Sequence, residues 1–296
     1  MNVLVVGAKG YIGSHLTEHL RRAEHNVTEI EHDSDCMQTD TGFLKHEYKL
    51  PTDCNAIIYL AQSPYYRRDN VNPSHLFTVN VINAVRFAEL AAQSGIARFI
   101  YASTGNVYAS SFEPMREDAS LTRDNWYSLS KVVAEESLQL FRDRLDISIV
   151  RPFGIYGPNQ QDKLIPHLLL RLTSGQEIQI EQNRYKPEDH DGLRISLCYI
   201  DDVVKMLADL IDVKGVQILN LAGSEVASIR KIATIAAQEL GVTPRFKLTD
   251  KFRDFDLIAD TAYLKTVLNP TLTPLSVGIS ATVKAYTQQC NNGRPL

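Results

Sequence analysis

Short apolar runs alternate with longer amphipathic stretches through the first half of the chain. This alternation predicts β-α-β units whose strands form a parallel sheet. The expected strands cover residues 2–6, 27–31, 56–60, 98–103 and 147–151. Three helices are expected: one that follows the first strand and ends near residue 23, and two that cover residues 74–94 and 126–144. The polar stretch 32–53 has little periodicity, so we expect loops there with a weak strand or helix.

The pattern changes after residue 152, where loops lengthen, prolines recur and helices no longer alternate strictly with strands. We expect strands at 196–200 and 217–221, a helix that Asp201 or Asp202 caps and that reaches residue 212, and helices at 228–240 and 276–289. The chain is therefore predicted to have an α/β fold, with a doubly wound parallel sheet over residues 1–152 and a smaller C-terminal α+β lobe over residues 153–296. The core of the sheet should extend to about residue 160 and take back some later segments, with the substrate in the cleft between the two parts.

Composition narrows the possible classes. The 296 residues, 44% of them hydrophobic, suffice for one large core or for a core with a satellite lobe. A formal net charge of -4 without basic runs argues against a nucleic-acid partner. The four cysteines lie far apart, without a CxxC pair or clustered histidines, so we expect neither a disulfide framework nor a metal site. No apolar run approaches the roughly twenty residues that span a bilayer, so a soluble, cytoplasmic protein without a membrane partner is expected.

Three glycines, Gly7, Gly10 and Gly13, follow the first expected strand directly and open the first helix. In a dinucleotide-binding loop one glycine permits a tight turn, another lets the backbone approach the pyrophosphate, and the third lets the helix pack close to the strand. The phosphates then meet the free N–H groups at the start of the helix. In this context the loop predicts a Rossmann-type dinucleotide site, whereas the alternative is a set of ordinary turn glycines.

An acidic residue, Glu31, ends the second expected strand. A carboxylate there can accept hydrogen bonds from the adenosine ribose hydroxyls and would repel a 2′-phosphate, so NAD is favoured over NADP. The neighbouring Lys9 and His32 would soften that preference. The alternative is a solvated glutamate in an acidic stretch.

The sequence Tyr127-Ser128-Leu129-Ser130-Lys131 starts the expected helix at 126–144. Residues four apart share one helix face, so the phenol and the ammonium should project into the same cleft. A nearby cation favours the phenolate, which would let Tyr127 take a proton from a substrate hydroxyl. Ser103 and Thr104 end a central strand, where a hydroxyl can hold the substrate oxygen beside that phenol. Alternatively the tyrosine and lysine form a surface pair, and the two hydroxyls satisfy turn N–H groups.

Together the glycine loop, YASTGNVY at 101–108, the YxxxK pair and RPFGIYGP at 151–158 resemble the extended short-chain dehydrogenases, specifically the sugar-nucleotide epimerase/dehydratase family. The resemblance covers essentially the whole chain and continues through KLIP at 163–166, YIDDV at 199–203 and NLAG at 220–223. It implies that Tyr127 is the catalytic acid/base, that Lys131 orients the nicotinamide ribose and that Thr104 is the hydroxyl partner. It also implies a homodimer formed by the helices at 74–94 and 126–144. The alternative is that the apolar surface of the helix at 74–94 is buried inside the monomer.

The resemblance further implies a set of binding residues. The cofactor contacts are expected at Gly7, Gly10, Tyr11, Ile12, Gly13, Glu31, Asp40, Leu60, Ala61, Gln62, Asn80, Ser103, Tyr127, Lys131, Pro152 and Phe153. The substrate contacts are expected at Thr104, Gly105, Asn106, Gly154, Leu164 and Arg194.

Three departures from the family pattern qualify this picture. Gly105 and Asn106 stand where 4,6-dehydratases of the family carry acidic residues, so that activity is disfavoured. Gly154 replaces an asparagine that commonly contacts the substrate diphosphate. Arg194 comes one place early, after a polar insertion at 184–192, which we interpret as a solvated surface loop in preference to a substrate loop.

Three hypotheses follow for the function. The first is an NAD-dependent epimerase that acts on a nucleotide-activated sugar through a transient keto intermediate. The second is a reductase or dehydrogenase of a keto-sugar or small carbonyl compound, which needs the same residues. The third is a catalytically silent dinucleotide sensor. Near the expected cleft, Tyr65, Tyr66, Arg67 and Arg68 either contact a nucleotide or sugar phosphate or form a polar loop.

Overall fold

The computed structural model describes residues 1–66 and 70–292. Its centre is a sheet of six strands in the order β12-β7-β6-β5-β1-β2, and every neighbouring pair in it is parallel. The bounds of these strands are β1 (Asn2–Val6), β2 (Asn26–Ile30), β5 (Ala56–Tyr59), β6 (Arg98–Ala102), β7 (Asp146–Pro152) and β12 (Ile218–Leu221). The predicted doubly wound α/β fold is therefore confirmed.

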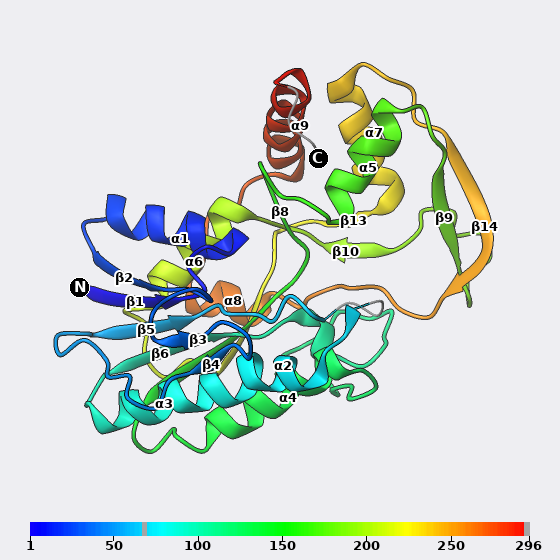
Figure 1. The fold of residues 1–296 in the computed structure, drawn as a ribbon. Coiled ribbons are helices and arrows are strands. Elements are labelled where there is room, and N and C mark those ends of the chain that lie inside the picture. The colour runs from blue at the N-terminus through cyan, green and yellow to red at the C-terminus, as the bar shows by residue number, and fades with distance from the viewer. Residues whose placement is uncertain (67–69, 293–296) are drawn as a thin grey trace.

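Helices cover both faces of this sheet (Figure 1). One face carries α1 (Tyr11–Arg22) and α6 (Ile200–Asp209), and the other carries α2 (Pro73–Phe77), α3 (Asn83–Gln93) and α4 (Trp126–Gln139). Alternate residues of β1 enter different cores: Val3 and Val5 pack with the α1 and α6 side chains, Leu4 and Val6 with those of α3 and α4. Burial on both faces explains why these strands are continuous apolar runs.

The helix expected at 74–94 is a continuous assembly of three segments. Asn72 accepts the His75 backbone N–H and Pro73 occupies the first turn, so both start signals agree. Between α2 and α3 the backbone widens to a π-helix at Thr78–Ile82, which carries the fully buried Asn80. A wider turn of this kind aims a polar side chain that regular α-helix spacing would place elsewhere.

The polar stretch 32–53 forms a small antiparallel hairpin, β3 (Met37–Gln38) with β4 (Phe43–Leu44), outside the main sheet. In the main sheet the strand order reverses between β1 and β5: β2 lies on one side of β1, and the next strand of the sheet, β5, lies on the other side. In doubly wound sheets ligands bind at such a switch point, outside the carboxyl ends of the strands.

The second lobe lies beyond these carboxyl ends. Helices α5 (Leu164–Thr173), α7 (Ile229–Leu240) and α9 (Leu275–Asn291) share one apolar core there. A parallel ribbon of β9 (Ile178–Asn183) and β14 (Phe246–Arg253) extends along the outer edge of the lobe in Figure 1. The remaining short elements are η3 (Gly105–Val107), β8 (Ile155–Tyr156), β10 (Arg194–Ser196), β11 (Cys198–Tyr199), β13 (Val226–Ser228) and α8 (Ala262–Val267).

Several boundaries after residue 152 differ from the sequence-based expectation. The strand expected at 196–200 is split into β10 and β11, which pair with different partners, β13 and β8. Helix α6 begins at Ile200 behind Tyr199, so neither aspartate caps it; Asp202 instead accepts hydrogen bonds from Thr273. Both α6 and β12 return to the sheet. Within the described residues no helix is long and apolar enough to cross a membrane.

Candidate active site

A cavity of about 950 Å³ lies at the carboxyl ends of β1, β5, β6 and β7, bounded on its other side by the second lobe. The described residues that line it include Lys9, Lys131 and Lys163, and no aspartate or glutamate. The predicted site residues that line it are Gly7, Gly10, Tyr11, Ile12, Gly13, Leu60, Gln62, Ser103, Thr104, Asn106, Tyr127, Lys131, Pro152, Gly154 and Leu164. The structure thus brings residues from six separate stretches of the expected site to one cleft with a cationic lining.

The glycine loop has the geometry that a pyrophosphate needs. Gly7 has a φ of +91°, and a Cβ there would lie 2.7 Å from the backbone nitrogen of Ala61, so only glycine fits. A Cβ at Gly13 would lie 2.7 Å from the carbonyl oxygen of Ala8 and closer still to that of Gly7. Gly10 is the N-cap of α1 and brings no side chain to its free N–H groups. These backbone donors and the helix dipole are therefore open to an anion in the cleft.

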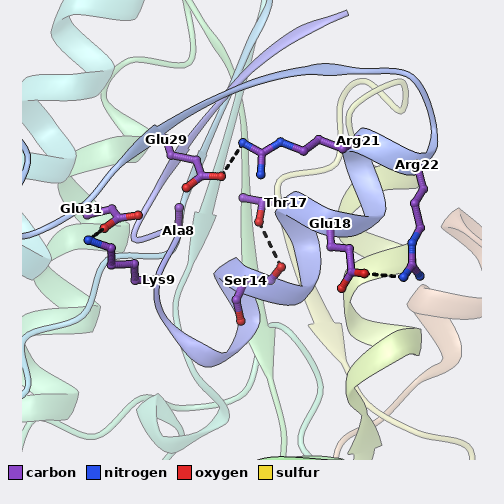
Figure 2. A pocket seen from close by; sticks show the side chains of 9 residues that line it. All are labelled: Ala8, Lys9, Ser14, Thr17, Glu18, Arg21, Arg22, Glu29 and Glu31. Atoms are coloured by element: carbon purple, nitrogen blue, oxygen red, sulfur yellow. Dashed lines mark hydrogen bonds and ion pairs between the residues drawn. The ribbon is translucent and has the colours of Figure 1, made fainter.

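Glu31 lies immediately after β2, with its side chain 11% exposed. Its carboxylate pairs with Lys9 (Figure 2). The Lys9 Nζ also lies 3.0 Å from Asp33. Glu31 thus faces a second pocket, of about 610 Å³, which adjoins the glycine loop and shares Lys9 and Ser14 with the main cleft. This ion pair gives a structural basis for the expectation that Lys9 weakens the preference for NAD over NADP.

The proposed catalytic side chains meet at the centre of the cleft. Asn125 caps α4, which places Tyr127 in its first turn. The Tyr127 hydroxyl hydrogen-bonds the side chain of Thr104. The ring of Tyr66 packs against the other side of the phenol, with centroids 5.2 Å apart, and Lys163 donates to the Tyr66 hydroxyl at 2.7 Å. Tyr127 is therefore held between the end of β6 and a contact that crosses from the sheet to the second lobe.

Burial perturbs both members of the tyrosine–lysine pair. It raises the pKa of Tyr127 to about 12; Tyr66 adds to the effect and the hydrogen bond with Thr104 opposes it. Lys131 is 2% exposed and donates to the carbonyl oxygen of Ala102 at 2.8 Å, and burial lowers its pKa to about 7. The Lys131 ammonium is not among the groups that shift the Tyr127 pKa. Burial is therefore the largest influence on the pKa of the phenol in this structure, and the acidifying effect of the lysine stays a prediction.

Four of the predicted cofactor and substrate residues do not line the cleft but pack against the residues that do: Ala61, Asn80, Gly105 and Phe153. Ala61 packs against Gly7, as described above. Asn80 accepts from the Ser63 backbone N–H at 3.2 Å and donates to Ser130 at 3.0 Å, which ties the loop after β5 to α4. Gly105 has no room for a side chain, because a Cβ would lie 2.9 Å from the buried ring of Phe153.

Two predicted residues do not reach the cleft. Asp40 lies exposed in the turn between β3 and β4, where it accepts from the Thr41 backbone N–H. Arg194 pairs with Asp189 at 3.0 Å, while its neighbour Ile195 lines the cavity. Because successive strand residues point to opposite faces, a place in β10 that brings Ile195 into the cleft turns Arg194 away.

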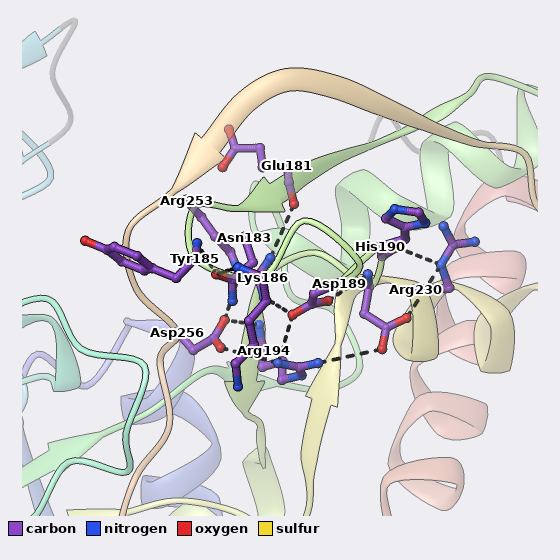
Figure 3. Close-up of polar contacts among 11 residues, drawn as sticks. Glu181, Asn183, Tyr185, Lys186, Asp189, His190, Arg194, Arg230, Arg253 and Asp256 are labelled. Carbon is purple, nitrogen blue, oxygen red and sulfur yellow. Dashed lines mark hydrogen bonds and ion pairs between the residues drawn. The ribbon is translucent and has the colours of Figure 1, made fainter.

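The insertion at 184–192 is anchored by buried charges rather than solvated throughout. Asp189 is 8% exposed and accepts from Arg253 at 2.7 Å, and the same guanidinium reaches Asp256 at 3.0 Å (Figure 3). Tyr185, in contrast, is exposed. The interpretation as a solvated loop is therefore correct only for part of the segment, and none of its residues lines the main cleft. Of the residues weighed near the cleft, Arg67 and Arg68 lie outside the described residues.

Sequence reasoning overlooked two parts of the site. Lys163, the N-cap of α5, lines the cleft, and its position just before an apolar helical run was an available signal. Glu135 lies one further turn along α4 from Lys131, and the regular spacing of residues 127, 131 and 135 could have revealed it.

The fold and the cleft define a class: a Rossmann-type dinucleotide-binding protein of the short-chain dehydrogenase type, with its glycine loop at the switch point of the sheet and a Tyr–Lys pair in the same cleft. Residues 3–222 match the NAD dependent epimerase/dehydratase family, and the chain belongs to that family. The resemblance drawn from the motifs is confirmed, and membership of an NAD-dependent family supports NAD as the cofactor.

Individual relatives are similar over most of the chain. The uncharacterized UDP-glucose epimerase YtcB of Bacillus subtilis is 27% identical, over 85% of this chain and 86% of that protein. A dTDP-4-dehydro-6-deoxy-D-allose reductase of Streptomyces sp is 26% identical, over 96% and 95%. Among solved structures, MoeE5 in complex with UDP-glucuronic acid and NAD superposes with a TM-score of 0.79 at 24% identity, covering 98% of this chain and all of that one.

Proposed function

We propose that the protein is an NAD-dependent epimerase of a nucleotide-activated sugar, with Tyr127 as the acid/base. The observation that carries the proposal is the meeting of Tyr127, its hydrogen-bond partner Thr104 and the buried Lys131 in the same cleft as the glycine loop. The relatives named as UDP-glucose epimerases support the substrate class.

The residues of the cleft suit NAD. The N–H groups at the start of α1 would hold the pyrophosphate, Glu31 the adenosine ribose and Lys131 the nicotinamide ribose. Bound NAD supplies the hydride acceptor and a positive ring that favours the phenolate. Tyr127 then accepts the proton of the sugar hydroxyl while Thr104 holds the phenol in place, and it returns the proton after the keto intermediate has turned.

The surroundings of Thr104 argue against dehydration. Elimination of water needs an acid and a base beside the substrate, and the two residues that follow Thr104 are Gly105 and Asn106. The Phe153 ring fills the space that a side chain at residue 105 would need. These two positions therefore supply neither the acid nor the base, and residue 105 has no room for a side chain, which disfavours a 4,6-dehydratase.

The lining of the cleft suits a diphosphate. Gly154 has a φ of +42°, and a Cβ there would lie 2.8 Å from the end of the Ile195 side chain, so the asparagine that is usual in the family would require that side chain to move. Lys163 lies at the start of α5 and supplies a cation on the second lobe. A charge-assisted contact from Lys163 would replace the missing amide.

The reductase of Streptomyces, similar over 96% of this chain, keeps a second candidate open: reduction of a keto-sugar with exchangeable cofactor. The test is to incubate the purified protein with a panel of UDP-, dTDP-, GDP- and CDP-sugars, follow the products by NMR and record NADH absorbance. An epimer without net NADH supports the epimerase, whereas stoichiometric NADH formation or consumption supports the second candidate. Tyr127→Phe should lower turnover by about 10²–10⁴-fold, and unchanged turnover contradicts the proposed role. NAD binding without any turnover points to the sensor.

A further inference from the structure

One face of α4 carries three functional side chains in successive turns: Tyr127, Lys131 and Glu135. The first two line the cleft, and Glu135 lies beneath them, only 1% exposed. Burying a carboxylate this deeply costs free energy of folding unless a cation and hydrogen-bond donors compensate for the lost water. The proposed function gives Glu135 no part.

The partners of Glu135 hold both of its oxygens. Arg151 donates through Nε to Oε1 at 3.1 Å and through Nη2 to Oε2 at 2.6 Å. The hydroxyl of Ser103 also donates to Oε1. Arg151 is 1% exposed and is itself fixed by the Tyr108 hydroxyl and the Glu117 carbonyl, both at 2.9 Å. All of these groups donate to the carboxylate or orient its donors, so the Glu135 side chain is held in one position.

Lys131 needs a negative charge nearby. Its ammonium donates to the Ala102 carbonyl and lies 4.8 Å from the centre of the Tyr101 ring, and neither group carries a charge. The titratable and charged groups around it are Tyr127 and Glu135 on α4, Tyr101 on β6 and, paired with Glu135, Arg151 on β7. Burial lowers the pKa of Lys131 to about 7, and Glu135 is the one group among these whose charge opposes that shift.

We propose that Glu135 is a positioning residue of the catalytic site, whose buried carboxylate keeps the Lys131 ammonium charged and is held in place by Arg151 and Ser103. The proposal rests on the proposed function, in which Lys131 orients the nicotinamide ribose, and it adds that the Glu135 carboxylate favours the cationic form of that lysine against the effect of burial. It also assigns a chemical role to Ser103. Because its proton is given to Glu135, Ser103 offers a ligand in the cleft only its lone pairs.

The experiment measures the titration of Lys131 itself. Protein labelled with ¹⁵N-lysine is titrated by NMR, with the Lys131 resonance assigned as the one lost in Lys131→Arg. Glu135→Gln should lower the midpoint of Lys131 by about one pH unit or more, the usual effect of an opposite charge at close range. The matched control is Glu136→Gln, which removes the same charge from the exposed neighbour that pairs with Arg123, and it should leave the midpoint unchanged.

A second variant separates the charge effect from damage to the fold. Glu135→Gln leaves Arg151 buried without its partner, whereas Glu135→Gln with Arg151→Met removes both charges and restores a neutral core. The double variant should fold and still show the lowered midpoint. In either variant the alkaline limb of the pH profile of kcat/KM should move down with it, which a merely structural role would not produce.

An unchanged Lys131 midpoint in the folded single variant overturns the proposal, and so does an unchanged midpoint in the double variant. The titration needs no substrate. A shifted midpoint in a protein that turns over no nucleotide sugar therefore supports the part given to Glu135 while contradicting the proposed function.

Discussion

The closest packing in the cofactor loop is at Gly13, and Gly13→Ala tests whether this packing supports the site. A Cβ there would lie 2.7 Å from the Ala8 carbonyl oxygen, and nearer to that of Gly7, whereas ordinary contacts begin near 3.4 Å. Helix α1 would have to move away from β1 by roughly 1 Å, which loosens the fully buried Leu16 and Leu20 against the sheet. Overpacking of this kind costs about 1–3 kcal/mol of unfolding free energy.

The same shift would carry the first N–H groups of α1 away from a bound pyrophosphate. Loss of one charge-assisted hydrogen bond costs about 1.5–3 kcal/mol, so NAD should bind roughly ten- to a hundredfold more weakly. Calorimetric titration with NAD and urea unfolding measure the two effects. Gly10→Ala is the control for the unfolding measurement alone, because its Cβ would lie 3.2 Å from the Gly7 carbonyl oxygen and the loop need yield only slightly. If Gly13→Ala binds NAD like the wild type, the packing argument for the loop is refuted.

Three further perturbations test the charges of the molecule. Glu31→Gln removes the charge that would repel a 2′-phosphate and leaves Lys9 paired with Asp33 alone, so it should raise affinity for NADP relative to NAD by about tenfold or more. Lys9→Met should strengthen the preference for NAD, and fluorescence titrations with both cofactors measure the ratio. The pKa of Lys131 is about 7 in the folded protein, against 10.5 for an ordinary lysine. Between these pH values the unfolded chain holds a proton that the folded protein has lost, so the free energy of unfolding rises with pH. Lys131→Met should therefore exceed the wild type in urea resistance near pH 6, by a margin that shrinks toward pH 10, and a margin independent of pH contradicts the shift. Arg253→Met removes the buried cation between Asp189 and Asp256, leaves them only the half-exposed Arg194, and should cost about 3 kcal/mol in urea unfolding, whereas Arg184→Met at an exposed pair should cost less than about 1 kcal/mol.

The parts of the fold that the sequence predicted share a local cause. Strands β1, β5, β6 and β7 are buried on both faces, and the long helix begins at Asn72 and Pro73, so apolar runs and start signals indicate them directly. The sequence-based prediction was less accurate where a strand forms only because a distant strand pairs with it. Residues 246–253 are mostly exposed and polar, and they form a strand because β9 pairs with them some seventy residues away.

The candidate site shows the same division. Gly7, Thr104, Tyr127 and Lys131 follow strands or begin helices, so their spacing places them, and the structure brings all four to one cleft. Their electrostatics could not be predicted in this way. The high pKa of Tyr127 comes from burial beside Tyr66, a residue from a different loop.

Buried charge explains why the polar insertion at 184–192 was interpreted as solvated. Hydropathy predicts from its own polarity alone whether a residue is buried or exposed. A partner of opposite charge within hydrogen-bond distance offsets much of the cost of burying a charge, so a charged residue can be buried against that prediction. Arg253 supplies that partner to Asp189 across 64 positions of sequence. The Glu135–Arg151 pair beneath the catalytic helix follows the same rule across 16 positions. Where a charged residue lies on the apolar face of a helix, as Glu135 does on α4, the useful question is therefore which distant cation meets it, and near an active site which catalytic group its charge acts on.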